Sequence, residues 1–325
     1  MRAATVTAHG APPEVLDRPD PVPGEGEVLV GVTAAAITPL DLLCASGTSY
    51  FGAPALPYVP GVQGVGLVRD GPGGLAGRRV WFASPAGTAP GDGGMAELAV
   101  AAEGSVVPVE ADVPDTVVAA LGLSAVAGWE VLAGRAGLAA GDSVLVLGAG
   151  GVVGQVAVQA ARLLGARRVV AAARSDRARE VAAAAGADVV VPLADGDEAS
   201  DLAQRFLEAA GGPVDVVVDP LAGVPGTAGL GALADGGRLV NLGSSAGPAL
   251  SVDSALVRSR SAAVLGYTNA ALPPQRRAEV LRNVIDHAAA GRLHVEHEVL
   301  PLEDVARGWS ATADGSARGR VVLVP

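Results

Sequence analysis

The feature that most constrains the fold is an apolar run that leads directly into a glycine-rich turn and then into a second apolar segment. The run is Ser143–Leu147, the turn is Gly148–Gly154, and the second segment starts at Gln155. Glycines between a strand and a helix let the backbone turn sharply and approach a ligand closely. The amide groups and the positive dipole end of the helix then favour a phosphate. The segment predicts a βαβ unit that binds a pyrophosphate.

The glycine spacing is G-x-x-G-x-x-G, because Gly150 and Gly154 stand too far apart for the strict G-x-G-x-x-G pattern. In a chain with 45 glycines such a triplet alone can be a packing feature. Its position between a clean strand and a clean helix favours nucleotide binding. The residues predicted to surround the phosphates are Gly148, Gly150, Gly151, Val152, Val153 and Gly154.

The texture of the sequence divides the chain into three parts. Residues 1 to about 115 carry short β-like runs between Pro/Gly turns, which predicts a strand-rich, antiparallel unit. From about 118 to 264, apolar strands alternate with Ala-rich helices, the pattern of a parallel sheet with crossover helices. After residue 265, a helix is expected over roughly 275–290, followed by short strands like those at the start of the chain. The predicted fold class is α/β, with a doubly wound parallel sheet.

Composition excludes several classes of partner and of chemistry. The net charge is −11, so no basic surface is expected for nucleic acid or acidic membranes. Gly, Pro or charge breaks each apolar run before 18 residues, and no basic region precedes an apolar run at the start, so a cytoplasmic location is expected. The chain has no Lys, which excludes a Schiff base and a P-loop lysine.

The end of the second predicted strand indicates which nucleotide binds. In NAD sites, an Asp or Glu at this point accepts hydrogen bonds from the ribose hydroxyls. Here the strand Val169–Ala173 is followed instead by Arg174 and Ser175. The planar guanidinium of Arg174 can pair with a 2′-phosphate, and Ser175 can donate a further hydrogen bond. NADPH is therefore the predicted cofactor. The alternative is that Arg174 is a solvated residue and that Ser175 caps the next helix.

Short motifs along the whole chain carry a resemblance to a known superfamily. They are Pro60–Gly66, Gly93–Glu97, Gly141–Gly148, Gly186–Asp188, Asp215–Asp219, Gly236–Gly243, Pro301–Asp304 and Arg318–Leu323. Their order and spacing resemble the medium-chain dehydrogenase/reductase superfamily, in its quinone oxidoreductase-like and enoyl reductase-like branch.

The resemblance implies a specific domain organisation. Residues 1–117 and 265–325 would form a mostly β, partly open barrel, the GroES-like catalytic domain. A Rossmann cofactor domain, residues 118–264, would be inserted into it, with the active site in the cleft between the two. The resemblance also implies a homodimer, joined through edge strands near Ser261–Gly266.

Departures from the zinc-dependent relatives narrow the chemistry. Those proteins hold zinc with Cys, His and a further Cys or Asp. Where they carry Gly-His-Glu, this chain has Gly61–Gln63, and it lacks their four-Cys lobe. Cys44, the only cysteine, is expected to be a small buried apolar residue. Strand alternation turns His297 away from His294 and Glu296, so no metal site is predicted.

The candidate catalytic residues come from the segment Thr38–Tyr50, which is similar to the run that borders the nicotinamide in quinone oxidoreductases. Thr38 stands where that family has Asn, Asp41 matches its Asp, and Tyr50 matches its Tyr with one extra residue before it. The resemblance gives them roles in orientation or proton delivery. The alternatives are that Asp41 caps the following turn and that Tyr50 or Tyr58 is an apolar lid.

Further cofactor contacts follow from topology and from the resemblance. In doubly wound sheets the ligand lies beyond the carboxyl ends of the strands, which selects the loops after Val218 and Leu242. The resemblance adds the segment after residue 266 and the basic residue Arg320 near the C-terminus. An ion pair with a surface acid would explain Arg320 equally well. The candidates are Asp219, Asn241, Gly243, Ser244, Tyr267, Asn269 and Arg320.

A reductase without a metal stabilises developing negative charge by hydrogen bonds alone, which suits quinones and conjugated carbonyls. The predicted function is NADPH-dependent hydride transfer to a quinone or a conjugated enone. One alternative is an enoyl or ketone reductase for a biosynthetic, polyketide-type intermediate, which differs only in its pocket. A second is a noncatalytic NADPH-binding protein, which the replacement of the family Asn by Thr38 leaves open.

Overall fold

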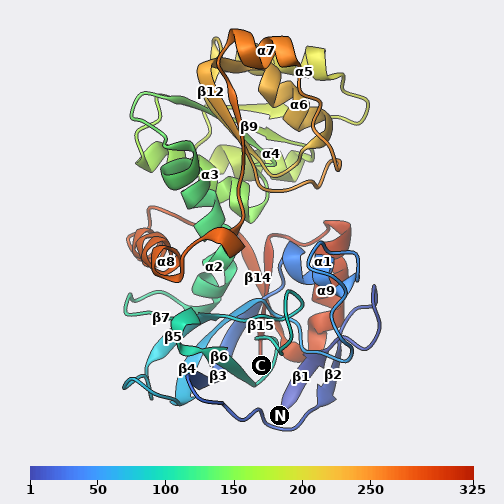
Figure 1. Ribbon diagram of the computed structural model, residues 1–325, viewed down its shortest axis with the longest axis vertical. Helices are drawn as coiled ribbons and strands as arrows, with labels where there is room; N and C mark the ends of the chain where they lie inside the picture. The colour runs from blue at the N-terminus through green and yellow to red at the C-terminus, as the bar shows by residue number, and fades with distance from the viewer. The chain divides into compact units, whose positions relative to one another are not determined.

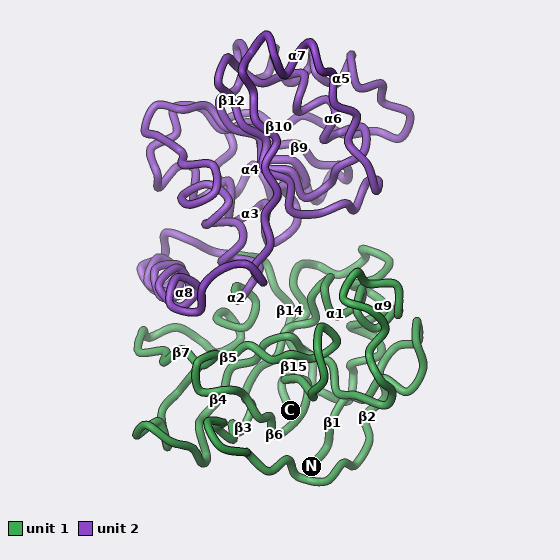
Figure 2. Tube along the Cα trace, in the orientation of Figure 1, with its two compact units in different colours: residues 1–122, 295–325 green, residues 123–294 purple.

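The computed structural model describes residues 1–325 as two compact units. Unit 1 comprises residues 1–122 and 295–325, and unit 2 comprises residues 123–294 (Figure 2). Both ends of the chain lie in unit 1, so unit 2 is an insertion in the sequence of unit 1.

Unit 1 is mostly β, with a two-stranded antiparallel sheet and a seven-stranded sheet (Figure 1). The small sheet is β1 (Arg2–Thr5) and β2 (Glu14–Asp17). The large sheet has the order β14-β15-β3-β4-β5-β7, with β6 also paired to β3. Its strands are β3 (Glu27–Ala36), β4 (Gln63–Asp70), β5 (Arg79–Ala83), β6 (Leu98–Ala102), β7 (Val106–Pro108), β14 (His297–Pro301) and β15 (Arg320–Val324).

The last strand, β15, returns the C-terminal segment to this sheet by antiparallel pairing with β3. Alternate residues of β3, among them Val28 and Val30, are fully buried and contribute to the core of unit 1. Two α-helices belong to unit 1: α1 (Pro39–Ala45) and α9 (Val305–Asp314). The strand-rich texture predicted at the two ends of the chain is thus one folded unit.

Unit 2 is built on a six-stranded parallel sheet of order β10-β9-β8-β11-β12-β13. Counted from its first strand, this is the order 3-2-1-4-5-6 of a doubly wound Rossmann sheet. The predicted α/β class is confirmed. The strands are β8 (Ser143–Leu147), β9 (Arg168–Ala173), β10 (Val189–Pro192), β11 (Val214–Asp219), β12 (Leu233–Asn241) and β13 (Ala263–Gly266).

The helices of unit 2 alternate with these strands because each parallel pair needs a crossover. They are α3 (Val152–Leu163), α4 (Asp176–Ala184), α5 (Ala199–Ala210), α6 (Gly223–Gly231), α7 (Ser254–Ser259) and α8 (Pro274–Ala289). The core of unit 2 lies between the sheet and these helices, with Phe206, Leu145 and Leu239 among its fully buried residues.

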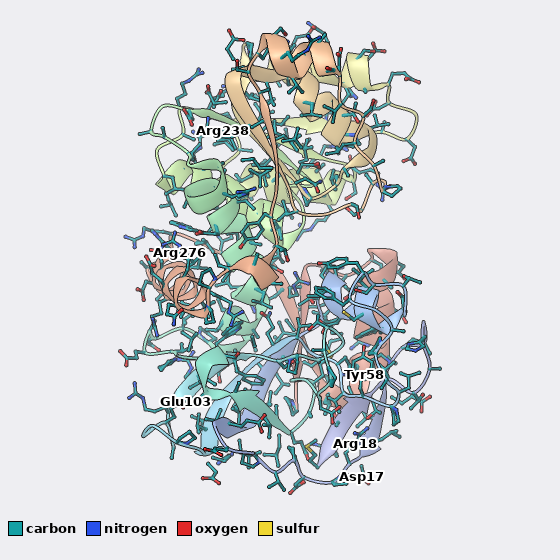
Figure 3. The ribbon with its side chains drawn as sticks, in the orientation of Figure 1. Asp17, Arg18, Tyr58, Glu103, Arg238 and Arg276 are labelled. Atoms are coloured by element: carbon teal, nitrogen blue, oxygen red, sulfur yellow. The ribbon has the colours of Figure 1, made fainter.

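The second domain boundary differs from the expected one, because residues 265–294 belong to unit 2. The helix α8 is attached there by side-chain contacts. Arg276, labelled in Figure 3, forms an ion pair of 2.9 Å with the buried Glu130. The rings of Trp129 and His287 also stack, with centroids 5.0 Å apart. The first boundary falls at 122/123, close to the expected 117/118.

The helix α2 (Asp115–Glu130) continues into a π-helical turn, Val131–Ala136. This 22-residue segment contains an 18-residue window with a mean hydropathy of 1.7, so by length and composition alone it could cross a membrane. However, 72% of that window is buried inside the protein, as in the core helix of a globular domain. Gly122 interrupts it with a non-helical backbone (φ 36°, ψ −137°).

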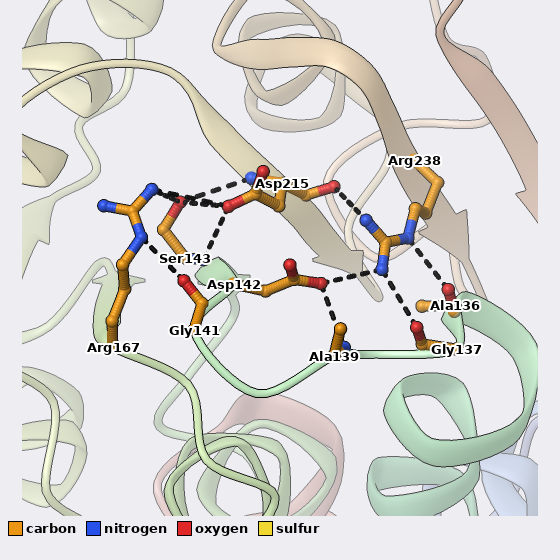
Figure 4. Close-up of polar contacts among 9 residues, drawn as sticks. All are labelled: Ala136, Gly137, Ala139, Gly141, Asp142, Ser143, Arg167, Asp215 and Arg238. Carbon is orange, nitrogen blue, oxygen red and sulfur yellow. Dashed lines mark hydrogen bonds and ion pairs between the residues drawn. The ribbon is translucent and has the colours of Figure 1, made fainter.

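A polar network ties the amino ends of the unit 2 strands together (Figure 4). Asp215 on β11 accepts hydrogen bonds from the Ser143 backbone N–H (2.7 Å) and hydroxyl (2.9 Å). Arg238 on β12 pairs with Asp142 at 2.8 Å and donates to the Ala136 carbonyl at 2.8 Å. These contacts occupy the amino edge of the sheet, so the loops at the opposite, carboxyl edge remain for a ligand.

Candidate functional site

The glycine turn, residues Gly148–Gly154, connects β8 to α3 as predicted. Gly148 has a φ of +62°, which favours glycine. A Cβ on Gly150 would lie 2.4 Å from the Cβ of Ala178 on α4. A Cβ on Gly154 would lie 2.5 Å from the backbone of Ala149. Three of the glycines are therefore required by the turn itself and by close packing.

Gly151 differs from the other three. A Cβ there would meet only the Gly148 carbonyl oxygen, at an ordinary 3.6 Å. Gly151 is the N-cap of α3 and provides no side-chain cap for the first turn of this helix. The N–H groups of Val152 and Val153 therefore lie at the N-terminus of α3, which has open space beside it and carries the positive end of the helix dipole. This arrangement fits a pyrophosphate.

Arg174 directly follows β9, at the same carboxyl edge of the sheet. Its side chain is 77% exposed and forms one contact of 3.7 Å with Asp195, itself 95% exposed. Arg179 donates to the Arg174 carbonyl at 2.5 Å. An exposed pair of this kind is weak, so the guanidinium of Arg174 is accessible to a phosphate.

Ser175 caps the helix α4, because its hydroxyl accepts a hydrogen bond from the Ala178 N–H at 3.2 Å. The structure therefore shows the capping role that the sequence left as the alternative. A cofactor contact of Ser175 stays a prediction. Asp195 was not found from sequence, although its loop follows β10, which pairs with β9. That pairing is the signal that places the two loops at one edge.

The loops after β11 and β12 are joined by Asp219 and Asn241, which face each other in the strand register. The amide nitrogen of Asn241 donates to Asp219 Oδ2 (2.8 Å) and to the Gly243 carbonyl (2.9 Å). Asp219 is fully buried, and burial raises the pKa of its carboxyl. It therefore has no exposed surface for direct contact with a cofactor, whereas Ser244 is exposed in the neighbouring loop.

Tyr267 and Asn269 follow β13 in unit 2. The Tyr267 N–H donates to the Asn241 carbonyl at 2.9 Å, which continues the pairing of β12 with β13. The Tyr267 hydroxyl donates to Asn269 Oδ1 at 2.7 Å, and the Asn269 amide donates to the Leu123 carbonyl at 2.9 Å. Burial raises the pKa of Tyr267. The two side chains are engaged with each other, and a cofactor contact from either stays a prediction.

In unit 1, Thr38 and Asp41 form a capping box at the start of α1. Asp41 Oδ2 accepts from the Thr38 N–H (2.8 Å) and hydroxyl (2.6 Å). Asp41 Oδ1 accepts from the N–H groups of Gly61 (3.0 Å) and Val62 (2.9 Å). Both side chains are buried, and burial raises the pKa of Asp41. The structure thus shows the structural role that was the alternative for Asp41, and a catalytic role stays a prediction.

Tyr50 is 77% exposed and packs its ring against Phe51, with centroids 4.2 Å apart. Tyr58, labelled in Figure 3, is by contrast buried, and its hydroxyl has no hydrogen-bond partner. Burial raises the pKa of this hydroxyl. Phe51, Tyr58 and Arg18 are among the residues that line a cavity of about 580 Å³ in unit 1. Tyr50 therefore presents its hydroxyl to solvent, whereas Tyr58 is a wall of the cavity.

Arg320 lies on β15 and is buried, with its guanidinium donating to the Ile37 carbonyl at 2.9 Å. Burial lowers the pKa of Arg320 to about 10. This contact joins β15 to the residue that follows β3, and pairing of Arg320 with a surface acid stays an untested alternative. A cofactor contact of Arg320 stays a prediction, without support from its surroundings.

Cys44 is buried, as expected. No group of three or more His, Cys, Asp or Glu residues in the chain is arranged to hold a metal ion. His294 is engaged through its backbone, because its N–H donates to the Gln159 side chain at 2.9 Å.

Two protein families match the two units separately. The alcohol dehydrogenase GroES-like domain matches residues 24–111, in unit 1. The zinc-binding dehydrogenase family matches residues 152–286, in unit 2. The second match extends past 265, in agreement with the placement of α8 in unit 2.

Individual relatives cover all or nearly all of the chain. A quinone oxidoreductase of Lama guanicoe is 30% identical, over all of this chain and 97% of its own length. A phenolphthiocerol/phthiocerol polyketide synthase protein of Mycobacterium tuberculosis is 33% identical over 93% of this chain, which spans only 14% of that protein. A solved mycobacterial structure, complexed with NADPH, has a TM-score of 0.87 and 28% identity, with both chains fully covered. The chain therefore belongs to the quinone oxidoreductase-like branch of the medium-chain dehydrogenase/reductase superfamily.

Proposed function

We propose that this chain is an NADPH-dependent oxidoreductase that transfers hydride to a quinone or a conjugated enone. One observation carries the proposal: the open space at Gly151, at the uncapped N-terminus of α3. The relatives support it, because the similar Lama guanicoe protein is a quinone oxidoreductase and the similar mycobacterial structure is complexed with NADPH.

The residues of unit 2 fit NADPH in two places. The amide groups at the start of α3 would hold the pyrophosphate, and the exposed guanidinium of Arg174 would pair with the 2′-phosphate. When bound, NADPH supplies the hydride. The chain itself binds and orients the cofactor and the substrate, and its hydrogen-bond donors stabilise the charge that develops on the substrate oxygen.

The proposed reaction does not use zinc. The donor set does not fit zinc, because Cys44 is buried without a second Cys or a His beside it in a three-ligand group. The resemblance places Val62 where zinc-dependent relatives carry His.

A second substrate class is favoured by one specific observation. The polyketide synthase protein is 33% identical over 93% of this chain, so the chain corresponds to one segment of a much longer synthase. An enoyl reductase for a biosynthetic thioester uses the same cofactor site and differs in the substrate pocket. The cavity beside Phe51 and Tyr58 is of the size that accepts a small molecule.

The assembly and location are part of the same proposal. The edge strand β13 pairs only with β12 and exposes Val264, so a two-fold partner can extend the sheet there. A homodimer is therefore proposed together with the reductase activity. A cytoplasmic location is a separate part of the proposal.

The decisive experiment is NADPH oxidation, followed spectrophotometrically, with a panel of quinones, enones and enoyl thioesters, before and after exhaustive chelation. Turnover with a quinone or an enone that survives chelation is the expected result. Turnover confined to enoyl thioesters selects the second class. A lack of turnover with the entire panel, despite NADPH binding, contradicts the enzymatic proposal and leaves a noncatalytic NADPH-binding protein.

A further inference from the structure

Asp219 is a buried carboxylate whose oxygens are both committed to hydrogen-bond donors. Oδ1 accepts from the N–H groups of Leu221 (3.0 Å) and Ala222 (2.8 Å). Oδ2 accepts from the Asn241 amide at 2.8 Å. Because Asp219 has no exposed surface, it cannot contact a ligand directly, and its hydrogen bonds can affect a ligand only through these partners.

The first partner segment, Pro220–Ala222, packs directly on the glycine turn. The position of a Cβ on Gly148 is 3.0 Å from Leu221 Cδ2 and 3.2 Å from Pro220 Cγ. On the other side, a Cβ on Gly243 would lie 2.5 Å from the Pro220 carbonyl oxygen. Pro220 and Leu221 therefore fill the space between the start of the glycine turn and the loop after β12.

The conformation of this segment depends on Asp219. Ala222 has a φ of +53° and a ψ of −147°, which a residue with a Cβ rarely adopts. Such a conformation persists only where the surroundings fix it, and the hydrogen bond from the Ala222 N–H to Asp219 does so. Gly226 has no room for a Cβ, because Asp219 Oδ2 lies 2.7 Å from that position. The Asp219 carboxylate is thus fixed both by its hydrogen bonds and by close packing against Gly226.

We propose that Asp219 is a positioning residue for the cofactor. It fixes Pro220 and Leu221 against Gly148 and so sets the geometry of the glycine turn that receives the pyrophosphate. The inference rests on the proposed placement of NADPH at this turn. It extends that proposal, because it predicts that Asp219 changes the affinity for NADPH without touching the cofactor.

The variant Asp219→Asn tests this with almost no change in shape. An amide at position 219 has one acceptor and one donor, so its NH₂ group must face either the Leu221 and Ala222 N–H groups or the Asn241 amide. Either orientation places donor against donor and releases part of the segment. We expect the affinity for NADPH and for NADH to fall by the same factor, about tenfold, because the pyrophosphate is common to both.

The same strand provides a matched control. Asp215 is the second residue of β11 and Asp219 is the last, and the Asp215 carboxylate also accepts a hydrogen bond from a backbone N–H, that of Ser143, at 2.7 Å. It belongs to the amino edge of the sheet (Figure 4), away from the glycine turn along the strand. We expect Asp215→Asn to lower the unfolding temperature as Asp219→Asn does, but to leave both dissociation constants unchanged. Equal loss of affinity in the two variants, or none in Asp219→Asn, overturns the inference.

A second variant decides the matter if Asp219→Asn does not fold. Leu221→Ala removes the side chain that lies against Gly148, and Leu207→Ala is its control. Both leucines are partly buried against the same hydrophobic core. The expected result is a severalfold weaker binding of NADPH in Leu221→Ala alone. Identical affinities in the two variants overturn the inference.

A third variant separates this inference from the proposed function. Gly151→Asp places a charge at the start of α3, where the pyrophosphate is proposed to bind. If Gly151→Asp leaves NADPH affinity unchanged, the proposed placement itself is wrong. If Gly151→Asp weakens binding but Asp219→Asn and Leu221→Ala do not, only the role of Asp219 is wrong.

Discussion

Gly151 and Gly154 stand three residues apart in the glycine turn, and only Gly151 has room for a side chain. A Cβ on Gly154 would lie 2.5 Å from both the Ala149 Cα and the Gly148 carbonyl oxygen, which are backbone atoms that cannot move aside. We therefore expect Gly154→Ala to lower the free energy of unfolding by about 1–3 kcal/mol, through overpacking.

Urea unfolding of Gly154→Ala measures this loss. The control is Gly104→Ala, at an exposed position where a Cβ meets no atom within 4 Å, and it should change stability by less than about 0.5 kcal/mol. Equal stability of the two variants would show that the turn is looser than the structure indicates.

Arg174→Ala is expected to reduce the preference for NADPH over NADH by about tenfold. The reason is that Arg174 is accessible at the carboxyl edge of the sheet and can form a charge-assisted pair with a 2′-phosphate, which NADH lacks. Titration of both nucleotides, monitored by nicotinamide fluorescence, gives the ratio. Arg177→Ala, an exposed arginine on α4 paired with Glu180, is the control. If Arg174→Ala lowers the affinities for NADH and NADPH by the same factor, Arg174 does not bind the 2′-phosphate.

The stability contributed by Asp215 is expected to depend on pH. Burial raises the pKa of this carboxyl, but the hydrogen bonds from Ser143 and the charges of Arg167 and Arg238 outweigh burial and hold the pKa below its ordinary value of 3.8. A pKa that is lower in the folded state stabilises the protein above the ordinary value, and the stabilisation is lost as the pH falls through the folded value. Wild type should therefore exceed Asp215→Asn in stability at pH 7, with a smaller difference at pH 3.

Urea unfolding of the two proteins at both pH values checks this sign. A difference that is the same at pH 3 and pH 7 would show that Asp215 acts through shape alone and that its charge contributes nothing.

Tyr50→Phe is expected to reduce turnover by no more than about 10²–10⁴-fold, the range of general acid catalysis, with NADPH affinity unchanged. Its hydroxyl is exposed, so it can approach a substrate but can also be replaced by water as a proton donor. Steady-state kinetics with the best quinone or enone gives the effect. Full turnover of Tyr50→Phe on every accepted substrate would exclude Tyr50 from proton delivery.

The parallel sheet and the glycine turn could be predicted because each is coded locally. The run Ser143–Leu147, the glycines after it and the apolar helix all lie within one continuous segment, and hydrophobic periodicity reports such elements directly. The sequence does not show that Gly151 has room for a side chain while Gly150 and Gly154 do not. The difference arises only in the folded structure, where Ala178 packs against Gly150 and Ala149 packs against Gly154.

Long-range partners account for what the sequence did not reveal. The sequence does not reveal that α8 packs with unit 2, because the pairing of Arg276 with Glu130 spans 146 residues. The role of Asp41 as a cap was one of two alternatives, and the N–H groups of Gly61 and Val62, some 20 residues away, complete its hydrogen bonds. In each case the deciding contact comes from a distant part of the chain.

The most direct test of the account is the affinity of Gly151→Asp for NADPH. An Asp at the N-cap of α3 should cap the helix and leave stability equal or higher, while its charge repels the pyrophosphate. We predict an unfolding temperature no lower than that of wild type and NADPH binding weaker by at least about tenfold. Gly104→Asp, which adds the same charge at an open, exposed position of unit 1, should bind NADPH as wild type does. Wild-type affinity in Gly151→Asp would contradict the placement of the cofactor at the glycine turn.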